Sequence, residues 1–206
     1  METLTKTLTK TRNITPEQMR SQIARFSERK VHMNHGVDPS IPAEAFAALN
    51  PPLHLLLAHA APGTHPDSLP AVAGQKGMVV CVLDIPPGGK VPLHAHLRSR
   101  ETFMCLKGRI RFRWNDHGQD ETFLEPFDLI DVPVGVYRDF QCAGAEPALL
   151  LAIITDERED EPGDVVVAPG ERARFAERFG AAILPKLTAA TGLHFTDPLA
   201  ARAVNR

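Results

Sequence analysis

Residues 88–108 read GGKVPLHAHLRSRETFMCLKG, a stretch in which two histidines and a glutamate stand in order between two glycines. The histidines are His94 and His96, the glutamate is Glu101, and the outer glycines are Gly88 and Gly108. With the composition of this chain, the pattern arises by chance about once in ten thousand such sequences. The stretch is therefore a specific signal, and its side chains are ones that bind metal ions.

The spacing of these residues predicts β-strands and a shared metal site. In a strand, residues i and i+2 point to the same side, so His94 and His96 share a face, and Glu101 reaches it from the next strand across a short turn. On a helix the two histidines would diverge by roughly 200°. Two imidazole nitrogens and one carboxylate oxygen leave other coordination positions of an ion open. We therefore expect a divalent ion here, with Fe as the first choice and Mn, Ni or Zn as alternatives.

Together these residues resemble the first conserved motif of the cupin superfamily, and every position of that motif is matched. The second cupin motif has a Gly-Asp start, a Pro-x-Gly and a histidine that serves as the fourth metal ligand. The stretch that follows in this chain keeps Asp128, Pro133 and Gly135, but has Phe127 for the glycine and Arg138 for the histidine. Because arginine stays protonated near neutral pH and has no lone pair to donate, the family's fourth ligand is absent.

The resemblance covers residues 77 to about 155 and implies an all-β fold, the double-stranded β-helix or jelly-roll barrel of the cupins. The hydrophobic pattern agrees, since several short strands separated by turn residues are typical of such folds. The clearest strand has apolar Ile110, Phe112 and Trp114 alternating with arginines. Strands are expected at residues 78–85, 91–96, 102–106, 109–114, 129–132, 137–142 and 148–155.

The N-terminal part, residues 1–76, is expected to form a helical and extended arm. Thr15-Pro-Glu-Gln18 is a capping box with proline at the first helical position, which predicts an amphipathic helix over residues 15–30. A second helix is expected over residues 42–49. The apolar residues 53–61 suit either a strand or a helix.

The C-terminal part, residues 156–206, is expected to pack on the barrel. It begins with an acidic segment, residues 156–164, which we interpret as a solvated loop without a functional role. A final strand is expected at residues 165–168. A helix over residues 171–184 has an apolar face suited to packing, and the near-neutral charge of the chain disfavours reading its arginines as a basic recognition surface.

Arg138 has three interpretations, which the sequence leaves open. If strand pairing follows the cupins, its guanidinium enters the pocket and orients a carboxylate or phosphate of a substrate, as a catalytic and substrate-binding residue. It can equally form an internal ion pair with Glu101, or point outward as a surface arginine. An arginine near a divalent ion is tolerable only if Glu101 and an anionic ligand neutralise both charges.

The walls of the pocket follow from counting in twos from these residues. This places Phe103 after Glu101 on one strand, Phe112 on the alternating strand and Phe140 after Arg138. We predict these three aromatic residues as substrate-binding walls, with core packing as the competing interpretation. None of the other histidines is selected by the sequence as a fourth ligand.

Composition limits the partners of the protein. The chain has 23 basic and 25 acidic side chains in 206 residues, a net charge of −2, which offers no general attraction to nucleic acid or anionic membranes. Its three cysteines have no CxxC spacing and indicate neither disulfides nor a zinc ribbon. No signal peptide and no run of about 20 apolar residues is found. We expect a cytoplasmic protein with a small-molecule ligand, and the resemblance to cupins implies a homodimer.

The function expected from these observations is that of a metal-dependent cupin enzyme. It would act on a small carboxylate-bearing substrate with dioxygenase-like or isomerase-like chemistry. The alternative is a small-ligand-binding or sensory cupin without turnover, with a degenerate or metal-free site. A metal-free sugar isomerase needs an acid–base pair that the sequence does not provide.

Overall fold

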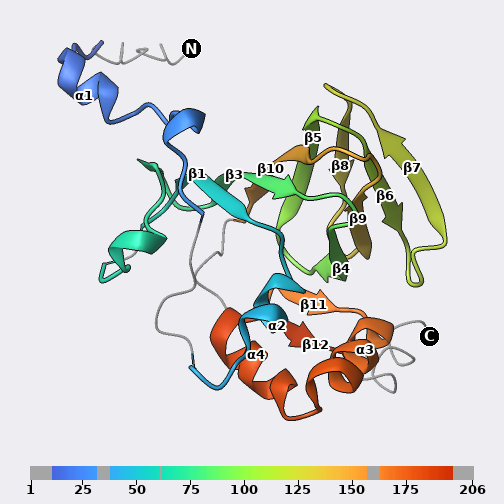
Figure 1. The fold of residues 1–206 in the computed structure, drawn as a ribbon. Helices are drawn as coiled ribbons and strands as arrows, with labels where there is room; N and C mark the ends of the chain where they lie inside the picture. Colours follow the sequence, from blue (N-terminus) through green and yellow to red (C-terminus); the bar gives the residue numbers. More distant parts are fainter. Residues whose placement is uncertain (1–10, 32–37, 61, 157–162, 197–206) are drawn as a thin grey trace, which may run out of the picture.

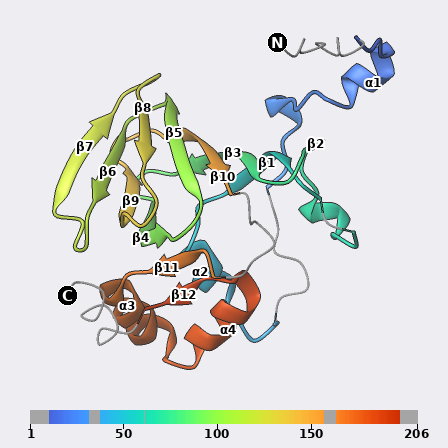
Figure 2. The same cartoon turned by 180° about the vertical axis from the view of Figure 1, so that it is seen from behind.

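The computed structural model describes residues 11–31, 38–60, 62–156 and 163–196, which form two β-sheets with helices beside one of them (Figure 1, Figure 2). Sheet A has the strand order β2 (Val72–Ala73), β1 (Leu53–Ala58), β3 (Met78–Ile85), β10 (Ala148–Thr155), β5 (Arg100–Lys107), β8 (Leu129–Val132). Sheet B has the order β12 (His194–Phe195), β11 (Val165–Val167), β4 (Lys90–His96), β9 (Arg138–Cys142), β6 (Ile110–Trp114), β7 (Asp120–Leu124). Neighbouring strands are antiparallel except for the parallel pairs β1–β2 and β11–β12.

The two sheets confirm the mostly β, jelly-roll architecture, with one correction. Among the described residues no strand of sheet A pairs with a strand of sheet B, so the sheets do not close into the expected barrel. The predicted strands are observed to within two residues, and residues 53–58 are a strand. The strands β2, β7 and β12 were not predicted. Two of them have only two residues, and β7 is a polar edge strand whose sequence, DETFL, lacks a clear alternation.

The main core lies between the sheets and is centred on three phenylalanines. Phe103 comes from sheet A, and Phe112 and Phe140 come from sheet B; their ring centroids lie 5.2 to 5.9 Å apart. The alternation in β6 works as predicted, since Ile110 and Phe112 are fully buried. The arginine between them, Arg111, is half-buried and its guanidinium donates to Gln141.

The helices form a second core beside sheet B. They are α2 (Ala43–Ala47), α3 (Pro169–Phe179) and α4 (Ile183–Thr191), and they pack around Phe175, Leu184 and Leu187. The expected single helix over residues 171–184 is wrong, because the chain breaks at Gly180, whose φ of 83° is outside the helical region and favours glycine. None of the described helices is long and apolar enough to cross a membrane.

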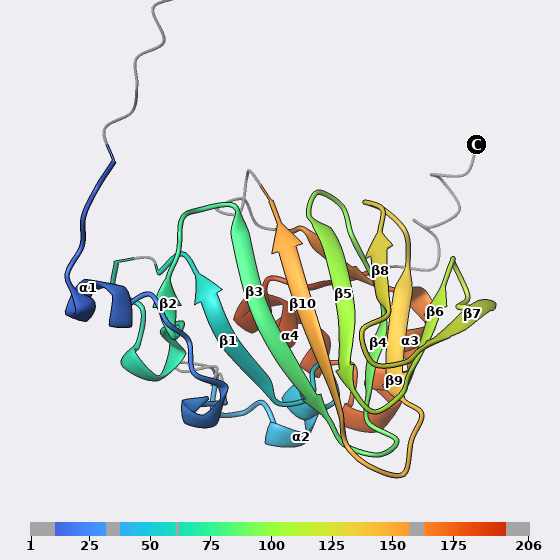
Figure 3. The ribbon, with the colours of Figure 1, turned by 90° about the horizontal axis from the view of Figure 1, so that it is seen from above.

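The expected N-terminal arm, residues 1–76, is wrong in part, because β1 and β2 belong to sheet A and α2 packs in the second core, whereas helix α1 (Pro16–Arg20) lies apart from the sheets (Figure 3). The capping box is present as predicted, with Thr15 and Gln18 bonded to each other's backbone N–H, but helix α1 ends after five residues. The expected helix over residues 15–30 is therefore wrong beyond Arg20. Met19 and Ile23 are 50% and 42% exposed, so the apolar side chains of this segment have no core against which a longer helix could pack.

Candidate metal centre

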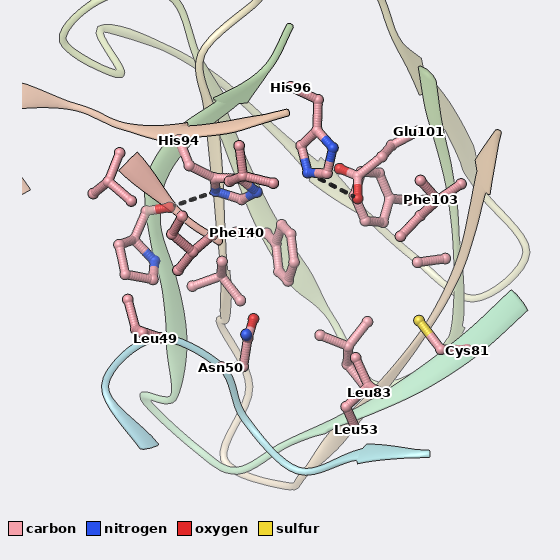
Figure 4. A pocket seen from close by; sticks show the side chains of 17 residues that line it. Leu49, Asn50, Leu53, Cys81, Leu83, His94, His96, Glu101, Phe103 and Phe140 are labelled. Atoms are coloured by element: carbon pink, nitrogen blue, oxygen red, sulfur yellow. Dashed lines mark hydrogen bonds and ion pairs between the residues drawn. The ribbon is translucent and has the colours of Figure 1, made fainter. Parts of the chain in front are cut away.

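The structure brings His94, His96 and Glu101 together on the inner side of the two sheets (Figure 4). The two histidines end β4, two residues apart on one face, and Glu101 begins β5 after a short turn, as the spacing predicts. One nitrogen of each histidine and one carboxylate oxygen of Glu101 all lie within 4.8 Å of one another. All three residues are at most 9% exposed. These residues are arranged as a group that a single ion can join.

His94 is held in one orientation by the backbone. Its Nδ1 lies 2.7 Å from the carbonyl oxygen of Pro92. Because a carbonyl only accepts hydrogen bonds, Nδ1 carries the proton and Nε2 keeps a free lone pair. Burial, with the charges of Arg138 and His96, lowers the pKa of His94 well below its usual value. A neutral imidazole of this tautomer is the form that binds a metal ion.

His96 is held by a carboxylate from a distant part of the chain. Its Nδ1 donates to Oδ2 of Asp164 at 2.7 Å, and the hydroxyl of Ser99 adjoins both groups. Its Nε2 then faces Oε1 of Glu101 at 3.4 Å. Although burial raises the pKa of Asp164, hydrogen bonds from His96 and Ser99 outweigh burial and lower that pKa below its usual value. A charged carboxylate behind a histidine fixes its tautomer and makes it a stronger ligand.

Asp164 corrects the interpretation of the acidic segment. Residues 157–162 lie outside the described residues, but Asp164 is not in a solvated loop. Besides His96 it accepts hydrogen bonds from the backbone N–H groups of Arg98 at 2.7 Å and Ser99 at 3.0 Å. Asp156 forms an ion pair with Arg98 at 3.3 Å. The one signal in the sequence was the position of Asp164 directly before the strand β11, which pairs with β4 beside His94 and His96.

Arg138 forms the internal ion pair that was one of its three interpretations. It is 1% exposed, so the surface interpretation is wrong. Strand pairing sets His94 opposite Arg138, and the guanidinium donates from Nε (3.1 Å) and from one terminal nitrogen to Oε2 of Glu101. The other carboxylate oxygen, Oε1, faces His96. Arg138 and a metal ion therefore do not compete for the same oxygen of Glu101.

A cavity of about 200 Å³ adjoins the three residues. Phe103 and Phe140 line it as predicted (Figure 4), but Phe112 and Arg138 are not among its lining residues. Phe112 is fully buried in the core between the sheets, which agrees with the packing interpretation of this residue. The remaining walls come from several elements: Leu49, Asn50, Leu53, Cys81, Leu83, Val91, Pro92, Ala152, Ile154, Val165, Val167 and Leu193.

Comparison with protein families identifies the fold to which this site belongs. The model of the family described as "Cupin domain" matches residues 81–154, which contain all three residues of the group and Arg138. Residues 81–154 therefore match the cupin domain family. The group of His94, His96 and Glu101 thus lies around the connection between β4 and β5, within the matched residues.

Two curated plant proteins are similar to part of this chain. Germin-like protein 5-1 of Oryza sativa subsp. japonica is 33% identical over 90 residues, which are 42% of this chain and 38% of the relative. Putative germin-like protein subfamily 1 member 2 of Arabidopsis thaliana is 25% identical over 96 residues, 44% of this chain and 41% of the relative. The chain therefore spans about two-fifths of the length of these relatives.

Solved structures are also similar to part of the chain. A conserved protein with a double-stranded β-helix domain from Klebsiella pneumoniae is 18% identical with a TM-score of 0.41, over 47% of this chain and 79% of that chain. The Cnp3 cupin domain of Schizosaccharomyces pombe is 17% identical with a TM-score of 0.39, over 52% of this chain and 67% of that chain.

Proposed function

We propose that this cupin holds one divalent metal ion at His94, His96 and Glu101 and uses it to bind a small carboxylate-bearing substrate. One observation carries the proposal: the other polar atom of each of these side chains already has a partner. Pro92, Asp164 and Arg138 respectively engage Nδ1 of His94, Nδ1 of His96 and Oε2 of Glu101. One donor atom of each residue is left facing the others, which is the arrangement that a metal site requires.

The residues fit a divalent ion chemically. Two imidazoles and one carboxylate suit Fe first, and Mn, Ni or Zn as alternatives, and leave open positions for a ligand. When bound, such an ion polarises a substrate or activates dioxygen. The chain's own residues hold the ligands in place and, through the apolar walls of the cavity, exclude water from them. Arg138 is a positioning residue in this proposal, since it acts through Glu101 rather than on the substrate.

Dioxygenase-like chemistry is favoured over isomerase-like chemistry by the groups that line the cavity. An isomerase moves protons and needs a general acid or base with a pKa near the working pH. Among the described residues that line the cavity, the only titratable side chain besides the three ligands is Cys81, and burial raises its pKa to about 12. Cys81 is therefore poorly suited to proton transfer.

A second candidate function is ligand binding without turnover. The observation that favours it is Arg138 in place of the histidine that completes the metal site in other cupins. Oxygen uptake by Fe(II)-loaded protein in the presence of small monocarboxylates distinguishes the two candidates: uptake that depends on the carboxylate indicates an enzyme. The homodimer and the cytoplasmic location stay predictions, and light scattering of the purified protein tests the first of them.

Metal analysis tests the proposed function. Protein purified without chelator, or supplied with Fe(II), Mn(II), Ni(II) or Zn(II), is expected to hold one ion per chain because the three ligands are already oriented. His94→Ala is expected to lose this ion, whereas His117→Ala, which changes an exposed histidine in the turn after β6, is expected to keep it. An unmutated protein that retains none of the four metals would refute the proposal.

A further inference from the structure

We infer that the cavity selects a ligand with a single carboxylate and a short apolar body, and that it rejects ligands with a second charge or several hydroxyl groups. This inference rests on the proposed function, because the metal ion is what binds the carboxylate. It goes further by naming the class of ligand. The observations that carry it are the composition of the walls, the volume of the cavity and the charges around the metal ligands.

The walls of the cavity offer almost no polar partner beyond the metal ligands. Apart from those ligands and the weakly polar thiol of Cys81, the only polar side chain among the described lining residues is Asn50, and none of them is a lysine or arginine. A hydroxyl or charged group placed against leucine, valine and phenylalanine loses its bonds to water without replacement. Sugars and polyanions are therefore disfavoured, while hydrocarbon is favoured by its removal from water.

The arginine that contacts Glu101 is not available to a substrate. Arg138 does not line the cavity, and its guanidinium is bonded to Glu101. A second carboxylate on the ligand would therefore have no cation to meet in the described walls. This position differs from one of the three interpretations that the sequence left open, in which Arg138 itself bound the substrate anion.

The charges around the ion favour a ligand with one negative charge. Arg138 cancels the charge of Glu101, and both imidazoles are neutral when they bind a metal. Asp164 cancels one of the two charges of a divalent ion. One positive charge remains, and a single carboxylate neutralises it in a buried site where an unbalanced charge is costly.

The volume limits the length of the apolar body. A cavity of 150 Å³ in a protein interior accommodates benzene, so the cavity of about 200 Å³ accommodates a ligand of about six to eight non-hydrogen atoms. The carboxylate is expected at the ligands and the apolar body along Leu53, Leu83 and Phe103. Asn50 lies on the side of the cavity away from the metal ligands, in the connection between α2 and β1, and its amide points into the cavity (Figure 4).

A series of straight-chain carboxylates tests this inference. Acetate, butanoate and hexanoate are titrated into protein loaded with Co(II), whose visible absorption reports ligands that bind the ion. The affinity is expected to rise about 15-fold for every two methylene groups, because each one leaves water for the apolar walls. Succinate has as many non-hydrogen atoms as hexanoate, and is expected to bind about tenfold or more weakly than hexanoate.

Two variants on one strand provide a matched control. Leu53 and Leu55 both lie in β1 and are both partly buried against the core, but of the two only Leu53 lines the cavity. Leu53→Gln is expected to flatten the dependence on chain length while leaving acetate binding and metal content unchanged, and Leu55→Gln is expected to preserve it. Equal affinities for acetate and hexanoate, succinate binding as tightly as hexanoate, or identical effects of the two variants would each overturn the inference.

The experiment separates failure of this inference from failure of the proposed function. Metal content is measured first, and a protein that takes up neither Co(II) nor any of Fe(II), Mn(II), Ni(II) and Zn(II) contradicts the proposed function alone. The apolar cavity is then tested without metal by ethanol, butanol and hexanol in a thermal unfolding assay. A rise in the unfolding temperature that grows from ethanol to hexanol supports the selection of apolar ligands. The absence of such a rise overturns the inference. If Leu53→Gln does not fold, the ligand series on the unmutated protein decides.

Discussion

Arg138→Leu is expected to lower the free energy of unfolding of the metal-free protein by about 3–5 kcal/mol, as is usual when one partner of a buried ion pair is removed. Arg138 is 1% exposed and Glu101 is 5% exposed, so the variant leaves the carboxylate charge buried without its cation. Urea unfolding in the presence of a chelator measures the effect. The double variant, which carries both Arg138→Leu and Glu101→Leu, has neither charge, and most of the lost stability is expected to return.

The response of stability to added metal distinguishes the pair of Arg138 and Glu101 from an ion pair with a structural role alone. A divalent ion supplies positive charge to Glu101, so added metal is expected to stabilise Arg138→Leu more than it stabilises the unmutated protein. Arg100→Leu is the matched control, since it removes an ion pair with Asp131 in which Arg100 is 59% exposed. Because water screens that exposed pair, its removal is expected to lower the free energy of unfolding far less than the removal of Arg138. The account of Arg138 is wrong if its variant costs no more stability than Arg100→Leu.

Asp164→Asn is expected to weaken metal binding by about 10- to 100-fold, the usual effect of changing a group that orients a metal-binding histidine. The carboxylate accepts the proton on Nδ1 of His96 and makes Nε2 a better donor. An amide has the same shape but lacks the charge, so the loss reports on electrostatics rather than on packing. Competition with a chelator of known affinity measures it.

The control for Asp164→Asn is Asp131→Asn, because Asp131 forms its ion pair with Arg100 on the outside of sheet A. This variant is expected to leave metal affinity unchanged. If Asp164→Asn binds metal as tightly as the unmutated protein, then the hydrogen bond between Asp164 and His96 has only a structural role.

The sequence could predict the three ligands because local geometry determines them. The period of two in a strand sets His94 and His96 on one face, and a turn of three residues returns Glu101 to it. The alternation in β6 predicted the burial of Phe112 in the same way, although it did not show whether that residue faced the cavity or the core. These features depend on residues close together in the chain.

The groups behind the ligands could not be predicted because they depend on long-range pairing. Asp164 reaches His96 from 68 residues away, through the pairing of β11 with β4. The direction of Arg138 depends on an irregularity of register between β4 and β9, which hydrophobic patterns do not reveal. Helix α1 shows that a local signal alone does not determine the length of an element. Its capping box is present as predicted, but the helix has no buried residue and ends after five residues.

Crystals of the protein loaded with zinc test the central claim most directly, by anomalous scattering from the ion. The account predicts one peak within about 2.0–2.2 Å of Nε2 of His94, Nε2 of His96 and Oε1 of Glu101, the usual ligand distances of zinc. Arg138 is expected to remain bonded to Oε2 of Glu101. A peak elsewhere in the protein, or an ion that displaces Arg138 from Glu101, would contradict the account.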